Sequence, residues 1–223
     1  AYKESGFFPE WASPGHRGCM VGNNSASVLV DAYVKGIKVD DLETLYKGLI
    51  HGTENVHPTV SSTGRLGHEY YNKLGYVPYN VKINESAART LEYAYDDFAL
   101  AQMAKALGKT DDYQALIRRA ANYRNVIDPR TGYAQGRHAD GTFLNDANAF
   151  NFARFITEGA PCHYTWYVPQ DPYGLMASMG GKDKYVAKLD SMFSEQRYWH
   201  GNEHCHQVAY MFNYAGEPWK TQR

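Results

Sequence analysis

Apolar residues recur at helical spacing along almost the whole chain, and the short alternating patterns that strands require are nearly absent. The clearest helix is predicted to begin after Asn84 as its N-cap and to stop at Gly108, a residue type that commonly follows a helix C-terminus. With 223 residues, of which 43% are hydrophobic, the chain can bury a substantial core. The pattern therefore predicts an all-α fold.

The same spacing predicts several further helices. Gly36 lies where a residue after a helix C-terminus belongs, and Asp40 followed by Glu43 has the form of an N-cap with a capping-box acid. The remaining helices and loops can be given by residue range. Helices are expected from Thr110 to Tyr123, from Asp183 to Phe193 and from about Glu203 to Tyr214, a turn from Asp128 to Gly132, and long loops from Gly52 to Gly67 and from Gly132 to Asn148.

Charge and cysteine usage exclude several classes of protein. The net charge is −1 with mixed signs along the chain, so no basic stripe points to nucleic acid or to an anionic membrane. No run of 18 apolar residues is present, and the N-terminal residues lack the form of a signal peptide. Cys19, Cys162 and Cys205 are far apart and odd in number, which implies neither a disulfide framework nor a zinc knuckle.

A series of short blocks spread along the chain resembles the glycoside hydrolase family 92 exo-α-mannosidases. The blocks are Gly18-Cys19-Met20-Val21-Gly22, Asp31-Ala32-Tyr33-Val34-Lys35-Gly36-Ile37, the run from Glu85 to Asp97, Thr157-Glu158-Gly159, Tyr164-Thr165-Trp166, His200-Gly201-Asn202-Glu203, and the run from Asn213 to Gln222. The resemblance covers nearly the whole chain in several independent blocks.

The resemblance implies an (α/α)6 toroid of helical hairpins, joined in that family to an N-terminal β-sandwich. Residues 1–223 are then expected to be part of one (α/α)6 catalytic domain, as a fragment of a larger chain. Family members carry a further Gly-Asn-Asp-Asp block downstream of the Pro-Trp-Lys-Thr-Gln motif, and the sequence ends at Arg223 before reaching it. The catalytic base is therefore expected outside this chain.

Glycoside cleavage requires a carboxylic acid that protonates the leaving oxygen, and Glu158 is the best candidate. It precedes an aromatic run and is expected to be surrounded by apolar side chains; a solvated loop carboxylate is the alternative. The resemblance implies that Glu158 is the general acid and that His163 and Trp166 contact the substrate. Within this block, Cys162 and His163 stand where the family usually has Trp and Gln.

A second group of polar residues lies at His200–His206. Glu203 and His206 are three residues apart and would share a helix face, whereas His204 and His206 would not, which argues against a zinc site on a helix. Asn202 and Glu203 offer the hard oxygen atoms that suit Ca²⁺. The resemblance implies that Asn202, Glu203 and His206 bind the sugar and that Asn202 and Glu203 hold Ca²⁺; helix capping by Asn202 is the alternative.

The adjacent acids Asp96 and Asp97 stand out in an otherwise apolar helix. Consecutive helical residues point about 100° apart, so at most one of them is expected to face the core. Asp31 lies in a similar apolar setting. The resemblance implies that these three aspartates line or brace a sugar pocket. Two segments depart from the family: the stretch from Phe193 to His200 is shorter, and the loop from Gly132 to Asn148 fits poorly.

The resemblance implies calcium-dependent, inverting hydrolysis of terminal α-linked mannose from glycans. The expected partners are mannose-containing glycans and the remainder of the polypeptide or a subunit, and the expected location is periplasmic or extracellular by family analogy. A non-catalytic helical glycan-binding module is the alternative. A di-metal oxidase needs two Glu-x-x-His motifs on helices, and the second such spacing, Glu54–His57, lies in a loop rich in Gly, Thr and Pro.

Overall fold

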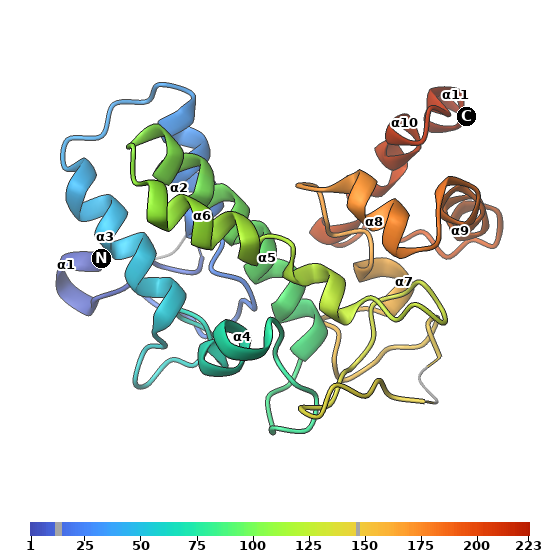
Figure 1. Ribbon diagram of the computed structural model, residues 1–223, viewed down its shortest axis with the longest axis horizontal. Helices are drawn as coiled ribbons and strands as arrows, with labels where there is room; N and C mark the ends of the chain where they lie inside the picture. Colours follow the sequence, from blue (N-terminus) through green and yellow to red (C-terminus); the bar gives the residue numbers. More distant parts are fainter. Residues whose placement is uncertain (12–14, 146–147) are drawn as a thin grey trace. The chain divides into compact units, whose positions relative to one another are not determined.

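The computed structural model describes residues 1–11, 15–145 and 148–223 (Figure 1). These described residues contain no β-strand and only three isolated β-bridges, Val56–Gly64, Ile127–Ala134 and Arg137–Phe143. The all-α prediction is confirmed. In the described ranges no helix is long and apolar enough to cross a membrane.

Most of the helices are short, and α5 is by far the longest. The α-helices are α1 (Tyr2–Ser5), α2 (Ser25–Val34), α3 (Leu42–Glu54), α4 (His68–Leu74), α5 (Ser86–Ala106), α6 (Thr110–Arg119), α7 (Pro161–Tyr164), α8 (Pro172–Ser178), α9 (Lys182–Ser194), α10 (Met211–Tyr214) and α11 (Pro218–Gln222). Single 3₁₀ turns occur at η1 (Asn122–Val126), η2 (Glu203–Cys205) and η3 (Val208–Tyr210).

The chain divides into two compact units. The first contains Ala1–Val77 and Glu92–Asn122, and the second contains Pro78–Leu91 and Tyr123–Arg223. That residues 1–223 belong to one (α/α)6 domain stays a prediction.

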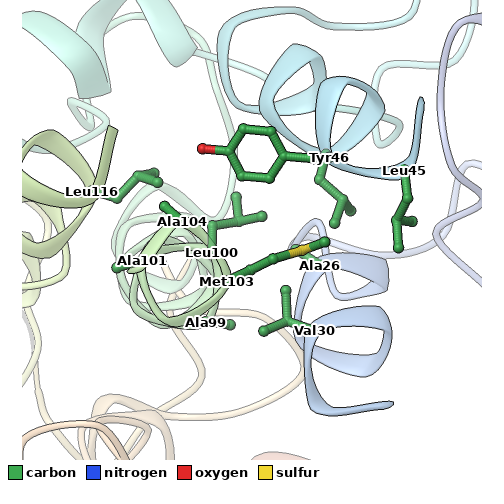
Figure 2. Close-up of a cluster of buried hydrophobic side chains, with 11 residues drawn as sticks. Ala26, Val30, Leu45, Tyr46, Ala99, Leu100, Ala101, Met103, Ala104 and Leu116 are labelled. Carbon is green, nitrogen blue, oxygen red and sulfur yellow. The ribbon is translucent and has the colours of Figure 1, made fainter. Parts of the chain in front are cut away.

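In the first unit, α2, α3, α5 and α6 contribute to a shared apolar core (Figure 2). Val30 of α2 and Leu49 of α3 are buried together with Leu100 and Met103 of α5 and Leu116 of α6. Burial of side chains of this size stabilises the fold by about 1.5–3 kcal/mol each. The C-terminal part of α5 is therefore stabilised mainly by packing against three neighbouring helices rather than by helix propensity alone.

Several predicted helix boundaries move by one or two residues. Helix α3 is capped by Asp41, which accepts a hydrogen bond from the Thr44 N–H at 3.1 Å, rather than by Asp40. It runs on to Glu54, so the expected loop from Gly52 begins later. Helix α5 begins at Ser86, two residues beyond the predicted cap Asn84.

Two further details concern α2 and the loop after Gly132. Gly36 follows α2 with a φ of 83°, as the sequence predicts. In this helix Ala26 and Val30 enter the core, whereas Val28 is 67% exposed. The expected loop from Gly132 to Asn148 includes residues 146–147, which lie outside the described residues.

The predicted continuous helix from Glu203 to Tyr214 is wrong. The backbone N–H groups of Cys205 and His206 bond to the carbonyls three residues earlier, at 3.1 Å each, which is the tighter 3₁₀ pattern. A second 3₁₀ turn and the short α10 follow. The apolar spacing is helical throughout this segment, which explains why the sequence alone cannot locate the breaks.

In the second unit, α8 and α9 pack around Trp166. The indole is fully buried, and its ring meets Tyr185 of α9 edge-on at 5.2 Å between centroids. Asp171 caps α8 by accepting from the Gly174 N–H at 2.9 Å, and it also accepts from the Tyr123 hydroxyl at 2.7 Å. Asp171 therefore fixes the start of α8 and links it to Tyr123.

Candidate functional site

Glu158 lies on a turn of unusual backbone geometry. Its φ is 48°, in the left-handed region that residues other than glycine rarely adopt, at a cost of about 1 kcal/mol or more. Its side chain is exposed, so the apolar surroundings expected from the sequence are not found among the described residues of the second unit. Strained residues of this kind persist only where the surrounding structure holds them in place, and they concentrate at functional sites.

Asn202 fixes the carboxylate of Glu158. The Asn202 Nδ2 donates to Glu158 Oε2 at 3.1 Å and to the Glu158 carbonyl at 3.5 Å. The Asn202 Oδ1 accepts from the Glu203 N–H at 3.0 Å, so the amide has a defined orientation with its donor facing Glu158. The Asn202 side chain is buried, which limits competition from water. Glu158 therefore presents its other oxygen, Oε1, to its surroundings.

His163 is held in one tautomer beside this turn. Its Nδ1 accepts from the Ala160 N–H at 3.0 Å, so the ring proton resides on Nε2, which donates to the Arg197 carbonyl at 3.0 Å. Burial lowers the pKa of His163, which keeps the ring neutral near pH 7. Both ring nitrogens are thus engaged in positioning the backbone on either side of the Glu158 turn.

His204 and Gly159 complete the support of the turn. The His204 ring stacks on Tyr164 at 4.3 Å, and burial lowers the pKa of His204 to about 4. A Cβ atom at Gly159 would lie 3.2 Å from His163 Nδ1 and 3.6 Å from His204 Nε2. The backbone after Glu158 therefore passes close to both imidazoles, and a Cβ atom at position 159 would require the His163 ring to shift by a few tenths of an ångström while making ordinary contact with His204.

The other predicted site residues of the second unit differ in accessibility. Glu203 and His206 are exposed at η2, and the His206 ring stacks on His200 at 4.7 Å. Trp166 lies in the interior and offers no exposed face to a ligand in this structure. Glu158, His163, Asn202, Glu203 and His206 are therefore grouped around two adjoining turns, whereas Trp166 supports them from the core. Substrate contact by each of them stays a prediction.

Asp97 of the first unit is at the centre of a buried ionic network. It accepts from Arg65 Nη1 at 2.7 Å, from Arg119 at 3.0 Å through both Nε and Nη2, and from the Tyr71 hydroxyl at 3.0 Å. The side chains of Asp97 and Arg65 have no exposed surface. This environment suits a residue that braces the fold.

The neighbouring Asp96 is also buried, so the expectation that at most one of this pair faces the interior is wrong. Its Oδ2 accepts from the Asn23 N–H at 2.9 Å, on a different side of α5 from the Asp97 network. Both residues can be enclosed because α5 is surrounded by its neighbours. Asp31, in contrast, is exposed and forms an ion pair with Lys35 at 2.7 Å.

The buried carboxyl of Asp96 makes the stability of the protein depend on pH. Burial raises the pKa of Asp96 to about 7, although Arg65 and the Asn23 N–H favour its charged form and Asp97 opposes it. The native state therefore retains a proton that the unfolded chain releases near the ordinary pKa of an aspartate, 3.8. This contribution to stability is present at low pH and is lost as the pH rises through about 7.

We therefore expect the stability of Asp96→Asn, measured relative to the wild type, to increase as the pH rises from 5 to 8. The amide stays neutral, so the variant avoids the ionisation that weakens the wild type over this range. Urea unfolding midpoints of both proteins at the two pH values would measure the difference. A difference that is constant or that narrows towards pH 8 would contradict this account of Asp96.

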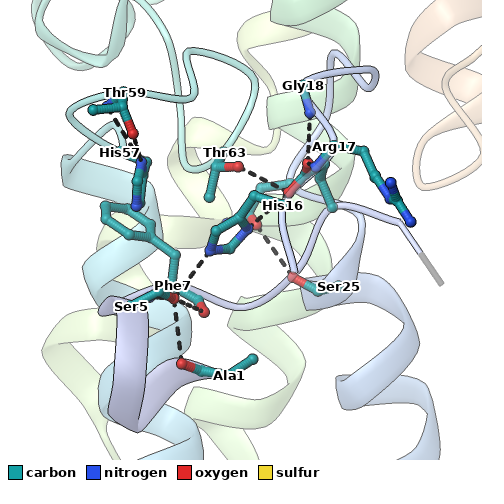
Figure 3. A network of polar contacts seen from close by, with 12 residues as sticks. Ala1, Ser5, Phe7, His16, Arg17, Gly18, Ser25, His57, Thr59 and Thr63 are labelled. Carbon is teal, nitrogen blue, oxygen red and sulfur yellow. Dashed lines mark hydrogen bonds and ion pairs between the residues drawn. The ribbon is translucent and has the colours of Figure 1, made fainter. Parts of the chain in front are cut away.

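Glu10 forms a buried polar network that the sequence did not reveal, and Figure 3 shows its partners His16, Gly18 and Thr63. Its carboxylate accepts from the Gly18 N–H at 2.9 Å, the Thr63 hydroxyl at 2.8 Å and His16 Nδ1 at 3.0 Å. Burial by itself raises the pKa of Glu10, but these backbone and hydroxyl donors outweigh it and lower the pKa to about 2. The network fixes the backbone that enters the Gly18–Gly22 block. No local sequence signal marks it, since Glu10 and Thr63 are 53 residues apart.

The described residues alone do not assemble a metal site. Among them no group of three or more His, Cys, Asp or Glu side chains is placed to hold a metal ion. Glu203 is exposed, and Asn202 Oδ1 retains a second lone pair beyond its bond to the Glu203 N–H. Ca²⁺ takes six to eight oxygen ligands, so these two residues would supply a minority of its coordination.

Comparison with known proteins places the chain in a family. The profile of the glycosyl hydrolase family 92 catalytic domain matches residues 1–223. A GH92 inverting mannosidase of Bacteroides thetaiotaomicron superposes with a TM-score of 0.94 at 43% identity, covering 99% of this chain and 33% of that one. A second GH92 α-mannosidase of the same organism gives a TM-score of 0.88 at 40% identity, covering 98% and 29%.

A curated relative is similar in sequence alone. It is described as an uncharacterized secreted glycosidase of Arthroderma benhamiae and is 28% identical over 249 residues, covering 97% of this chain and 32% of the relative. The chain spans about a third of the length of the relatives it matches. Because the family profile matches residues 1–223, the chain belongs to the catalytic domain of glycosyl hydrolase family 92.

Proposed function

We propose that the protein to which this chain belongs hydrolyses terminal α-linked mannose from glycans, with inversion at the anomeric carbon and with Glu158 as the general acid. The main support is the geometry of Glu158, whose carboxyl group is exposed on a strained turn and oriented by Asn202 at 3.1 Å. A relative described as an inverting mannosidase, 43% identical to this chain, supports this reaction.

The proposed acid has a defined site for its proton. Asn202 Nδ2 donates a hydrogen bond to Glu158 Oε2, so Oε2 must act as an acceptor. In the protonated acid, the proton then resides on Oε1, from which it would pass to the departing glycosidic oxygen. An inverting enzyme also needs a carboxylate about 6.5–9.5 Å away that activates water. We propose that the rest of the polypeptide, or a subunit, supplies this base.

The reaction can be tested with a panel of simple glycosides. The full-length protein is expected to release the aglycone from aryl α-mannosides much faster than from aryl β-mannosides or α-glucosides. Activity confined to another sugar or anomer would overturn the proposal. Mannose binding without any hydrolysis would support a non-catalytic glycan-binding module in its place.

Calcium dependence is part of the same proposal. The hard oxygens of Glu203 and Asn202 would hold the ion, with the other ligands supplied by substrate hydroxyls, water or further parts of the protein. Bound Ca²⁺ would polarise the hydroxyl groups of the sugar it contacts and fix their orientation.

We expect EGTA to reduce mannosidase activity at least about 10-fold, and added Ca²⁺ to restore it. Added Mg²⁺ should restore less of the activity, because Mg²⁺ requires octahedral coordination with shorter metal–oxygen distances than Ca²⁺. Glu203→Gln should raise the Ca²⁺ concentration that gives half-maximal recovery. Full activity of a metal-free preparation, verified by elemental analysis, would contradict a calcium requirement.

We also propose a periplasmic or extracellular location. A relative described as a secreted glycosidase supports it, as does the proposed substrate, since glycans that carry terminal mannose are found largely outside the cytoplasm.

A further inference from the structure

A groove of about 460 Å³ in the second unit has a basic lining. The residues that line it include Arg130, Gly132, Tyr133, Phe150, Lys184 and Lys188. In the part of the chain that the structure describes, no aspartate or glutamate is among the lining residues. Because Glu158, Asn202 and Glu203 do not line this groove, an inference about it does not depend on the proposed hydrolysis.

The Arg130 guanidinium is committed to the fold. Its Nε donates to both carboxylate oxygens of Asp128 at 3.0 Å, and its Nη2 donates to Asp128 Oδ2 at 2.7 Å. The remaining donors reach Asn145 Oδ1 at 3.0 Å and the Leu144 carbonyl at 2.9 Å. The Asp128 carboxylate has no exposed surface and neutralises the charge of Arg130. The free positive charge of the groove therefore comes from the two lysines.

Lys184 and Lys188 are one helical turn apart on α9, so their side chains share a face of this helix. Burial lowers the pKa of Lys188, and the nearby charge of Lys184 lowers it further. The two ammonium groups thus repel each other within one groove, and like charges at this spacing destabilise a helix. An anion bound to both ammonium groups would offset this repulsion with two attractions.

The stems of both lysines lie against glycine backbone. A Cβ atom at Gly132 would lie 2.8 Å from Lys188 Cε, and one at Gly180 would lie 3.0 Å from Lys184 Cδ. The Lys188 ammonium also lies 4.0 Å from the centre of the Tyr133 ring. Side chains confined in this way lose less conformational entropy when a ligand binds than freely mobile surface lysines do.

The lining favours a compact group that carries several acceptor oxygens. Phosphate and sulfate groups have such oxygens on a single centre, so one group can accept hydrogen bonds from two ammonium groups at once. The volume of the groove is larger than a single anion requires. Phe150, which is 44% exposed, lines the remaining space and offers an aromatic face to a sugar ring attached to the anion.

We propose that this groove is a binding site for a phosphate or sulfate group, free or carried by a sugar, and that Lys184 and Lys188 hold the anion. The site would let the protein retain glycans with acidic substituents through contacts outside the Glu158 turn.

Competitive labelling of lysines in the full-length protein tests this site. A trace of N-hydroxysuccinimide acetate at pH 8 acetylates the neutral amine of each lysine, and mass spectrometry measures each position. Mannose 6-phosphate is the probe, mannose is its uncharged control, and sodium chloride keeps the ionic strength constant. A bound phosphate group covers both ammonium groups and favours their charged form. Labelling of Lys184 and Lys188 is therefore expected to fall about 10-fold at saturation, whereas labelling of Lys38, whose side chain is 90% exposed, should not change.

A substitution on α9 shows whether the two lysines act together. Lys184→Gln is the main variant, because this side chain is exposed and its replacement should not disturb folding. The concentration of mannose 6-phosphate that half-protects Lys188 is expected to rise about 10-fold in this variant. Lys182→Gln is the matched control, since Lys182 is on the same helix but pairs with Glu217, and it should leave that concentration unchanged.

Inorganic phosphate and inorganic sulfate distinguish the sources of the anion. Protection by mannose 6-phosphate at lower concentration than by either inorganic anion would support a sugar ester as the ligand, and protection at equal concentrations would support the free anion. Wild-type protein in which Lys184 and Lys188 are not protected, or are protected no more than Lys38, would overturn the site. Unchanged protection of Lys188 in Lys184→Gln would also overturn it.

Discussion

Replacement of Asp97 by alanine is expected to lower the free energy of unfolding by about 3–5 kcal/mol, the loss typical when one partner of a buried ion pair is removed. Asp97 receives hydrogen bonds from Arg65, Arg119 and Tyr71. Without this carboxylate, the Arg65 guanidinium would keep its charge in the interior but lose its hydrogen-bonded ion-pair partner, leaving it the rings of Tyr71 and Tyr93 and the electrostatic influence of Asp96. This charge loses its hydrating water on folding, and the ion pair with Asp97 would no longer offset that loss.

Urea unfolding of the wild type and of Asp97→Ala would measure this loss. Asp31→Ala is the matched control, since Asp31 is also a helical aspartate with a basic partner but its side chain is 61% exposed. That control should change stability by less than about 0.5 kcal/mol. Equal effects of the two substitutions would show that burial of the Asp97 network does not stabilise the fold.

Replacement of Glu158 by glutamine is expected to reduce turnover of methyl α-mannoside by about 10²–10⁴-fold. Glutamine keeps the shape of the side chain and can still accept from Asn202 Nδ2 through its carbonyl oxygen, but it has no proton to give to the leaving oxygen. Sugar binding should therefore be retained. Turnover of an aryl mannoside with a very good leaving group should fall much less, because that leaving group departs with little need for protonation.

Kinetics of both substrates, together with binding of mannose to the variant by calorimetry, would measure these effects. Asp183→Asn removes an exposed carboxylate at the start of α9 in the same unit and is the matched control. It should retain full activity on both substrates. Undiminished hydrolysis of methyl α-mannoside by Glu158→Gln would show that another group is the acid.

The all-α fold and the longer helices α2, α3, α5, α6 and α9 could be predicted from the sequence because they rest on local periodicity, whereas short helices such as α1, α4 and α7 were missed. Helix α5 is an example, since its apolar repeat persists over many turns and glycine follows its end. The errors arise where tertiary contacts override local pattern. The segment from Glu203 to Tyr214 has helical spacing but breaks into 3₁₀ turns, and Val28 fits a helical repeat yet remains 67% exposed.

The candidate site could be predicted in part. The sequence indicated Glu158, Asn202 and Glu203 through their blocks, and the structure adds that Asn202 bonds to Glu158 across 44 residues. The burial of both Asp96 and Asp97 could not be predicted, because their partners lie in distant segments, such as Arg65, 32 residues before Asp97. Glu10 was missed for the same reason. Pairings of this kind depend on the fold, and no spacing rule encodes them.

The most direct test of the central claim is proton NMR of methyl α-mannoside during hydrolysis by the full-length protein with Ca²⁺ present. The account predicts that mannose is released and that the β-anomer appears first, before mutarotation produces the α-anomer. Release of the α-anomer first would contradict inversion and would require a nucleophilic carboxylate about 5 Å from the acid. Release of no mannose at all would contradict the assignment of this reaction to the protein.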